Sequence, residues 1–135
     1  MKYVVLFLAL ISGWGAAQAQ SVDKFKPIIE QQLQSMAKDD NVGAWNQASP
    51  SIHMLFPTPD DFMFMVRSQY PMVYRYKGYT FLEAGTDPSG RPFQHLRIQG
   101  EDGAFYDAIY FMQQQPDGSW LISGCVIAKT KGGEA

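Results

Sequence analysis

Asp107 is the carboxylate whose sequence neighbours could give it a chemical role. In an alternating strand it shares a face with three apolar residues, Phe105, Ile109 and Phe111. A carboxylate in an apolar pocket can act as a general base. However, the opposite face, with Ala108, Tyr110 and Met112, is an equally good inner face. We therefore favour an outer position for Asp107, paired with Arg97 or another cation.

Tyrosines are the second group of candidates, because a tyrosine offers a ligand a rigid apolar surface with a polar tip. The chain has a cluster of tyrosines around Pro71, and the candidates for ligand binding are Tyr70, Tyr74, Tyr76 and Tyr110. In a catalytic interpretation, Tyr74, Tyr76 or Tyr110 would donate a hydrogen bond to an oxyanion. The interpretation we favour is that strands simply prefer tyrosine.

The two histidines, His53 and His95, are weaker candidates. His53 is the alternative to Asp107 as a catalytic residue, and His95 shares a strand face with Phe93 and Arg97. Neither histidine has a helical i, i+4 partner or a carboxylate motif beside it, so we predict no metal site. The glycines form no phosphate-binding loop, and we predict no cofactor.

Cys125 is the only cysteine in the chain. It lies within a predicted strand between Gly124 and Val126, with no histidine or cation beside it. A reactive thiol needs such neighbours to lower its pKa. We therefore interpret Cys125 as a structural side chain. Two alternatives stay open, a nucleophilic or redox thiol and an intermolecular disulfide.

The N-terminus predicts a secretory signal peptide over residues 1–19. Lys2 precedes an apolar run from Tyr3 to Ile11, and small residues follow as far as the A-x-A cleavage pattern Ala17-Gln18-Ala19. The run is shorter than the about 20 residues that span a bilayer. The alternatives are a membrane anchor and a buried helix. Cleavage would leave a periplasmic or secreted protein with no membrane span.

The mature chain would have 116 residues, which is 135 minus 19, and 10 basic residues (11 minus Lys2) against 13 acidic ones. This length is typical of one domain that can build a core without metals or disulfides. Lysine and arginine do not cluster in the sequence, and this argues against binding to nucleic acid.

Three segments of the first half predict helices. Residues 26–38 have apolar side chains at helical spacing. A short second helix over 41–48, capped by Asp40 or Asn41, is expected to stop at Ser49-Pro50. A third helix begins at Thr58-Pro59 and is expected to end at Pro71.

Four runs rich in tyrosine, phenylalanine, valine and isoleucine follow, at 72–84, 91–99, 104–114 and 119–130. Turn signals separate them, and Gln115-Pro116-Asp117-Gly118 has the pattern of a type I turn. Strands joined in this way form an antiparallel meander. The sequence therefore predicts one α+β domain over residues 20–130, with N-terminal helices packed on a curved sheet. Residues 131–135 are expected to be a disordered tail.

Both faces of the last two predicted strands are largely apolar. In the last strand, one face would hold Trp120, Ile122, Gly124 and Val126, and the other Leu121, Ser123, Cys125 and Ile127. An antiparallel sheet with one face in water normally alternates apolar and polar residues. We therefore expect the outer face to be partly covered, and we predict a homodimer formed through it.

Three segments resemble the family called domain of unknown function 4864: MAKDDNVGAWNQASPSI (36–52), FMFMVRSQYPMVYR (62–75) and DGAFYDAIYFMQQQPDGSWLISGC (102–125). The resemblance covers nearly the whole mature chain. It implies the nuclear transport factor 2-like cone, also called SnoaL-like or cystatin-like, with a pocket at its mouth. Proteins of that fold include isomerases, dehydratases, carriers and dimerising modules, so the fold does not choose a function.

The sequence thus favours a small exported domain without catalysis, which binds a small apolar ligand or a protein partner. One alternative is a small isomerase or hydratase that uses Asp107 or a histidine with a tyrosine. Another is a structural subunit of an envelope assembly. The position of Asp107 separates the first two interpretations, because only a base inside a closed cavity can act on a bound substrate.

Overall fold

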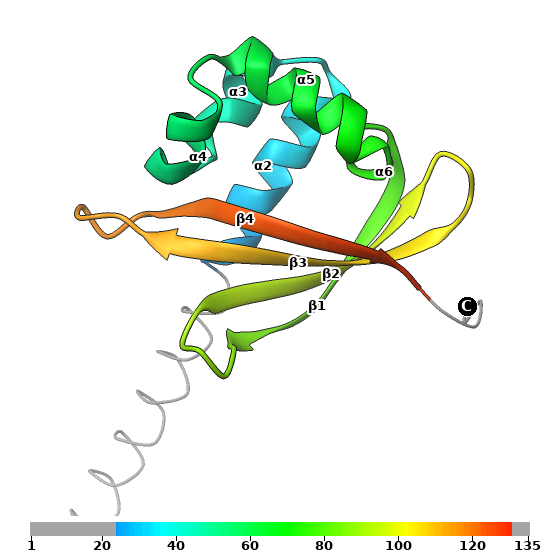
Figure 1. Ribbon diagram of the computed structural model, residues 1–135. Helices are drawn as coiled ribbons and strands as arrows, with labels where there is room; N and C mark the ends of the chain where they lie inside the picture. Colours follow the sequence, from blue (N-terminus) through cyan, green and yellow to red (C-terminus); the bar gives the residue numbers. More distant parts are fainter. Residues whose placement is uncertain (1–23, 131–135) are drawn as a thin grey trace, which may run out of the picture.

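The helices of this protein come first in the chain and the strands last (Figure 1). The computed structural model describes residues 24–130; the predicted signal peptide and tail lie outside them. The helices are α2 (Phe25–Ala37), α3 (Asn41–Asn46), α4 (Pro50–Leu55), α5 (Pro59–Gln69) and α6 (Pro71–Tyr74). The strands are β1 (Tyr76–Thr86), β2 (Pro92–Gly100), β3 (Phe105–Gln114) and β4 (Trp120–Lys129). The predicted α+β class is confirmed.

Local capping explains where α3 and α5 begin. The Asp40 carboxylate accepts a hydrogen bond of 3.0 Å from the backbone N–H of Gly43 at the start of α3. The Thr58 hydroxyl accepts one of 3.1 Å from the N–H of Asp61 at the start of α5. Each cap satisfies a backbone donor that has no partner within the helix. The Thr58 cap was predicted, and Asp40 was one of the two caps predicted for the second helix.

Two prolines begin helices that the sequence analysis missed. Pro50 was expected only to stop the preceding helix, but it is the first residue of α4. Pro71 was expected to end a helix, and it also begins the short turn α6. Proline suits a first helical turn because its missing N–H has no partner there anyway. The strand predicted from residue 72 therefore begins later, at Tyr76.

The four strands form one antiparallel sheet in the order β1-β2-β3-β4, as predicted. The expected turns close with backbone hydrogen bonds between Asp87 and Gly90 (2.8 Å) and between Gln115 and Gly118 (2.8 Å). Gly118 has a φ of 91°, a conformation that glycine adopts without steric cost.

The helices cover one face of the sheet (Figure 1), and the core lies between them. From α2 it takes Ile29, Leu33 and Met36, and from β2 and β3 it takes Leu96, Ile98, Ala108, Tyr110 and Met112. Trp120 packs edge-on against Phe25, with ring centroids 4.9 Å apart. No helix within residues 24–130 is long and apolar enough to cross a membrane.

An irregularity in the pairing of β3 with β4 overturns one predicted strand face. Phe111 pairs with Gly124, whereas the next residue, Met112, pairs with Ile122. The extra residue, Ser123, forms a bulge that shifts the alternation of side chains by one. Ile122 is therefore buried while Val126, predicted on the same face, is 57% exposed. After the bulge, Cys125 is the residue that lies on the helix side of the sheet.

A cleft between two helices and an edge strand as candidate site

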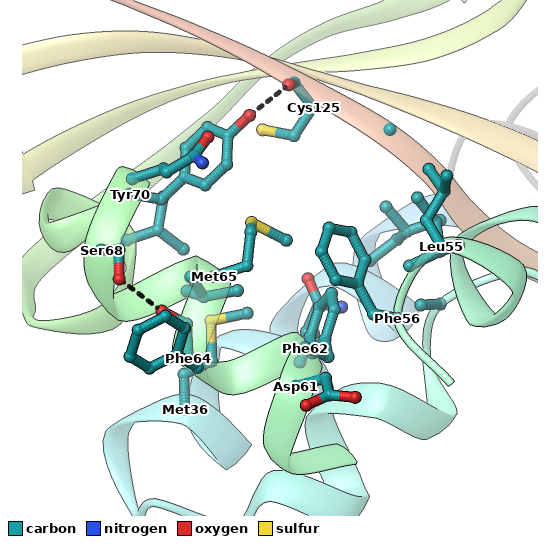
Figure 2. A pocket seen from close by; sticks show the side chains of 18 of the residues that line it. Met36, Leu55, Phe56, Asp61, Phe62, Phe64, Met65, Ser68, Tyr70 and Cys125 are labelled. Atoms are coloured by element: carbon teal, nitrogen blue, oxygen red, sulfur yellow. Dashed lines mark hydrogen bonds between the residues drawn. The ribbon is translucent and has the colours of Figure 1, made fainter. Parts of the chain in front are cut away.

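An open cleft of about 660 Å³ lies between α4, α5 and the strand β4 (Figure 2). We call it the α4–α5 cleft. Its lining is mostly apolar and includes Ile52, Leu55, Phe62, Met65, Tyr70 and Cys125. Its volume lies within the range of small-molecule binding sites, which are typically lined by apolar side chains with a few polar groups.

Backbone contacts hold the segment before α4 against the sheet. Ile122 of the edge strand donates a hydrogen bond of 2.9 Å to the carbonyl of Gln47, and the Ser49 N–H donates one of 2.8 Å to the carbonyl of Ile122. At the other end of α4, the Trp45 indole N–H donates to the carbonyl of Phe56 at 2.9 Å. These contacts fix both ends of the α4 segment, and so they keep this wall of the cleft in place.

Three uncharged polar groups gather where the cleft meets the sheet. The Tyr70 hydroxyl donates to the Cys125 carbonyl across 3.4 Å, as Figure 2 shows. The Tyr110 side chain is 1% exposed and lies beside the Cys125 thiol. Its hydroxyl has no partner of hydrogen-bonding geometry among the described residues. Buried polar groups are nearly always hydrogen-bonded, so an unpaired hydroxyl at a cleft is unusual.

Burial keeps these groups protonated. It raises the pKa of the Cys125 thiol to about 12. It also raises the pKa of the Tyr70 hydroxyl and moves that of Tyr110 well above its usual value. The thiol is therefore neutral at physiological pH, as is expected of a structural cysteine rather than a nucleophile.

Charge is nearly absent from the cleft. No lysine, arginine or histidine lines it within the described residues, and its only ionisable carboxylate is that of Asp61. Asp61 is exposed and lies at the end opposite Tyr70 and Cys125 (Figure 2). The inner end of the cleft is thus uncharged.

The structure brings two of the four candidate tyrosines, Tyr70 and Tyr110, to the cleft. The other two lie elsewhere. The Tyr74 hydroxyl donates to the Asp39 carboxylate, which Arg75 also contacts at 2.9 Å. The Tyr76 ring packs edge-on against Tyr79, with centroids 5.4 Å apart.

Asp107 lies on the sheet face opposite the helices, so it is remote from the cleft. Its carboxylate contacts His95 Nε2 at 2.9 Å and Arg97 at 3.4 Å, and it accepts a hydrogen bond of 3.0 Å from the Thr130 hydroxyl. The hydrogen bond from His95 is the main cause of its lowered pKa. A carboxylate held in this way is a weak base, which is the opposite of the environment that general bases have.

The histidines also lie outside the cleft. His53 stacks on Trp45 with ring centroids 3.6 Å apart, and its Nε2 lies 2.8 Å from the Trp45 carbonyl oxygen. His95 lies between two carboxylates, since its Nδ1 is 3.0 Å from Glu83. The described residues contain no group of three or more histidine, cysteine or acidic side chains placed to hold a metal.

The apolar mouth of the cleft was not predicted from the sequence. Leu55 is 72% exposed and Phe64 is 66% exposed, and both line it. Large apolar residues that are exposed together at a hollow typically mark a binding site. The preference of proline for a first helical turn would have revealed α4, and with it the wall that carries Leu55.

The fold and site together define a small α+β domain with an apolar cleft. The chain belongs to the family described as domain of unknown function 4864, whose model matches residues 18–135. No curated protein matches the chain.

Proposed function

We propose that this protein binds a small apolar ligand in the α4–α5 cleft and that it does so without catalysis. The observation that carries the proposal is the cleft itself, which is lined by apolar side chains and has the Tyr70 hydroxyl and the Cys125 thiol at its inner end. Such a combination holds the apolar body of a ligand by burial and orients it with a few polar groups.

The positions of the ionisable residues favour binding over catalysis. Asp107 and His53, the candidates for a base, are engaged by other residues outside the cleft. Inside it, Tyr70, Tyr110 and Cys125 are donors that stay protonated, so none of them can accept a proton. Asp61 is exposed and lies at the end of the cleft opposite Tyr70 and Cys125.

A dye-binding experiment with two adjacent variants tests the proposal. The probe is the uncharged fluorescent dye N-phenyl-1-naphthylamine, titrated with the purified mature protein. Leu55 lines the cleft and Met54 does not, although both are exposed, at 72% and 82%, on the same helix. Leu55→Asp removes apolar contact and adds a charge, so we expect at least about fivefold weaker dye binding.

Met54→Asp is the matched control, and we expect it to bind the dye as the unmodified protein does. Equal weakening by both variants would mean that the dye responds only to charge on this helix. No binding to the unmodified protein, or equal binding to all three proteins, would refute the cleft as the binding site.

We further propose that the domain is exported and that it is a cone fold of the nuclear transport factor 2-like kind. The A-x-A pattern at Ala17-Gln18-Ala19 supports export, and helices packed on one face of an antiparallel meander support the fold. The intact mass of the protein recovered from the periplasm or medium tests export. We expect the mass of residues 20–135; the mass of the full chain in the cytoplasm would contradict it.

A further inference from the structure

We propose that the ligand of the α4–α5 cleft is uncharged, with an apolar body and an oxygen that accepts a hydrogen bond at the end formed by Tyr70 and Cys125. The inference rests on the proposed function, because it names the chemical class of the ligand for that same cleft. It excludes carboxylates and phosphates, the commonest head groups of biological amphiphiles.

The described residues of the cleft offer no counter-charge to an anion. An anion that enters the cleft leaves its hydration shell, and no cationic side chain lines the cleft within residues 24–130 to replace it. Burying an unpaired charge costs far more than burying a neutral polar group. Among the described residues, the one charge at the cleft is the carboxylate of Asp61, which repels an anion.

Hydrogen-bond donors lie at the inner end of the cleft. The Tyr70 hydroxyl is 3.4 Å from the Cys125 carbonyl, which is long compared with the about 2.7–2.8 Å of a typical O–H···O hydrogen bond. A ligand oxygen can therefore replace this contact at little cost. The Cys125 thiol lies next to it, and the Tyr110 hydroxyl lies beside that thiol, enclosed by the core. All three groups stay protonated, so they offer no charge to an ion, and the Tyr70 hydroxyl and the Cys125 thiol offer hydrogens to an acceptor.

The volume of the cleft limits the size of its ligand. If each non-hydrogen atom takes about 30 Å³, the share of one molecule in liquid water, then 660 Å³ holds about 20 such atoms. A chain of ten carbons with one oxygen fits within this limit. Its apolar part would lie along Phe62 and Met65, towards the open mouth at Leu55 and Phe64 (Figure 2).

Competition between two ligands that differ only in charge tests the inference. The bound dye N-phenyl-1-naphthylamine is displaced at pH 7.5 with 1-decanol or with decanoate, both below the concentrations at which they aggregate. We expect decanol to displace the dye at a concentration at least about tenfold lower than decanoate. Equal potency, or stronger displacement by decanoate, would overturn the inference while dye binding upheld the proposed function. Displacement by neither compound would also overturn it.

A variant that supplies the missing cation sharpens the test. Gln69 is exposed and lines the cleft, whereas Asn46 is exposed but does not. We expect Gln69→Lys to reduce the preference for decanol over decanoate to less than about threefold, because the lysine pairs with the carboxylate. Asn46→Lys changes the net charge equally and should leave the preference unchanged. If both variants changed it by the same factor, net charge and not the cleft would set the preference, and the inference would fail.

Discussion

Removal of one buried oxygen atom should stabilise this protein. The Tyr110 hydroxyl is enclosed by the core, and its polar neighbour, the Cys125 thiol, does not lie in hydrogen-bonding geometry. Leaving such a group unsatisfied costs about 1–3 kcal/mol, and Tyr110→Phe removes that cost. The gap left by the oxygen, roughly 20 Å³, costs about 0.5 kcal/mol at about 24 cal/mol per Å³. We therefore expect the free energy of unfolding to rise by about 1 kcal/mol.

Thermal and urea unfolding of the ligand-free protein measure this effect. For a domain of this size, about 1 kcal/mol corresponds to a rise in Tm of about 4–8 °C. Tyr70→Phe is the matched control, because it removes a hydroxyl that does donate a hydrogen bond, and it should lower stability slightly. If Tyr110→Phe lowered the free energy of unfolding by 1 kcal/mol or more, the hydroxyl would have a partner and the reasoning about the inner end of the cleft would be wrong.

Three further predictions concern other parts of the molecule. The raised pKa of Cys125 predicts that a thiol reagent at pH 8 modifies it about a thousandfold more slowly than free cysteine; a comparable rate would contradict its burial. For the predicted homodimer, light scattering should show that Val126→Glu on the outer sheet face dissociates it while Val42→Glu, at an equally exposed valine on α3, does not; a monomeric unmodified protein would refute the dimer. The pKa of Asp107 is lower in the folded than in the unfolded chain, so its stabilisation is present above about pH 4 and is lost as the pH falls through the folded pKa. Urea unfolding should show that Asp107→Asn costs up to about 1 kcal/mol at pH 7, a small cost because the side chain is partly exposed, and less at pH 2; an equal cost at both pH values would contradict the ion pairs.

Local signals predicted much of the fold. Some features depend only on residues within a few positions of one another, so they can be predicted from the sequence. Examples are the helix caps at Asp40 and Thr58 and the turn that ends at Gly118. The alternation along β3 separates Asp107 from Ala108, Tyr110 and Met112. These three residues are buried, so Asp107 lies on the outer face, the position that we favoured from the sequence. Such patterns depend only on the period of the strand.

The cleft could not be predicted in the same way. Its inner end depends on the bulge at Ser123, which exists only through the pairing of β4 with β3 and which turns Cys125 towards the helices. Its outer wall depends on α4, where Pro50 follows a short helix and was interpreted only as its end. Tyr70 and Cys125 are 55 positions apart in the chain, and no local pattern shows that they meet.

Native mass spectrometry of the protein, purified gently from the cells that produce it, tests the central claim most directly. The claim predicts an additional mass of an uncharged amphiphile that is lost on denaturation, that is retained by Met54→Asp and that is absent from Leu55→Asp. Two results together would contradict the claim that the α4–α5 cleft is a ligand site. The purified protein would show only the bare mass of the chain, and 1-decanol, added at concentrations that displace the dye, would not increase that mass.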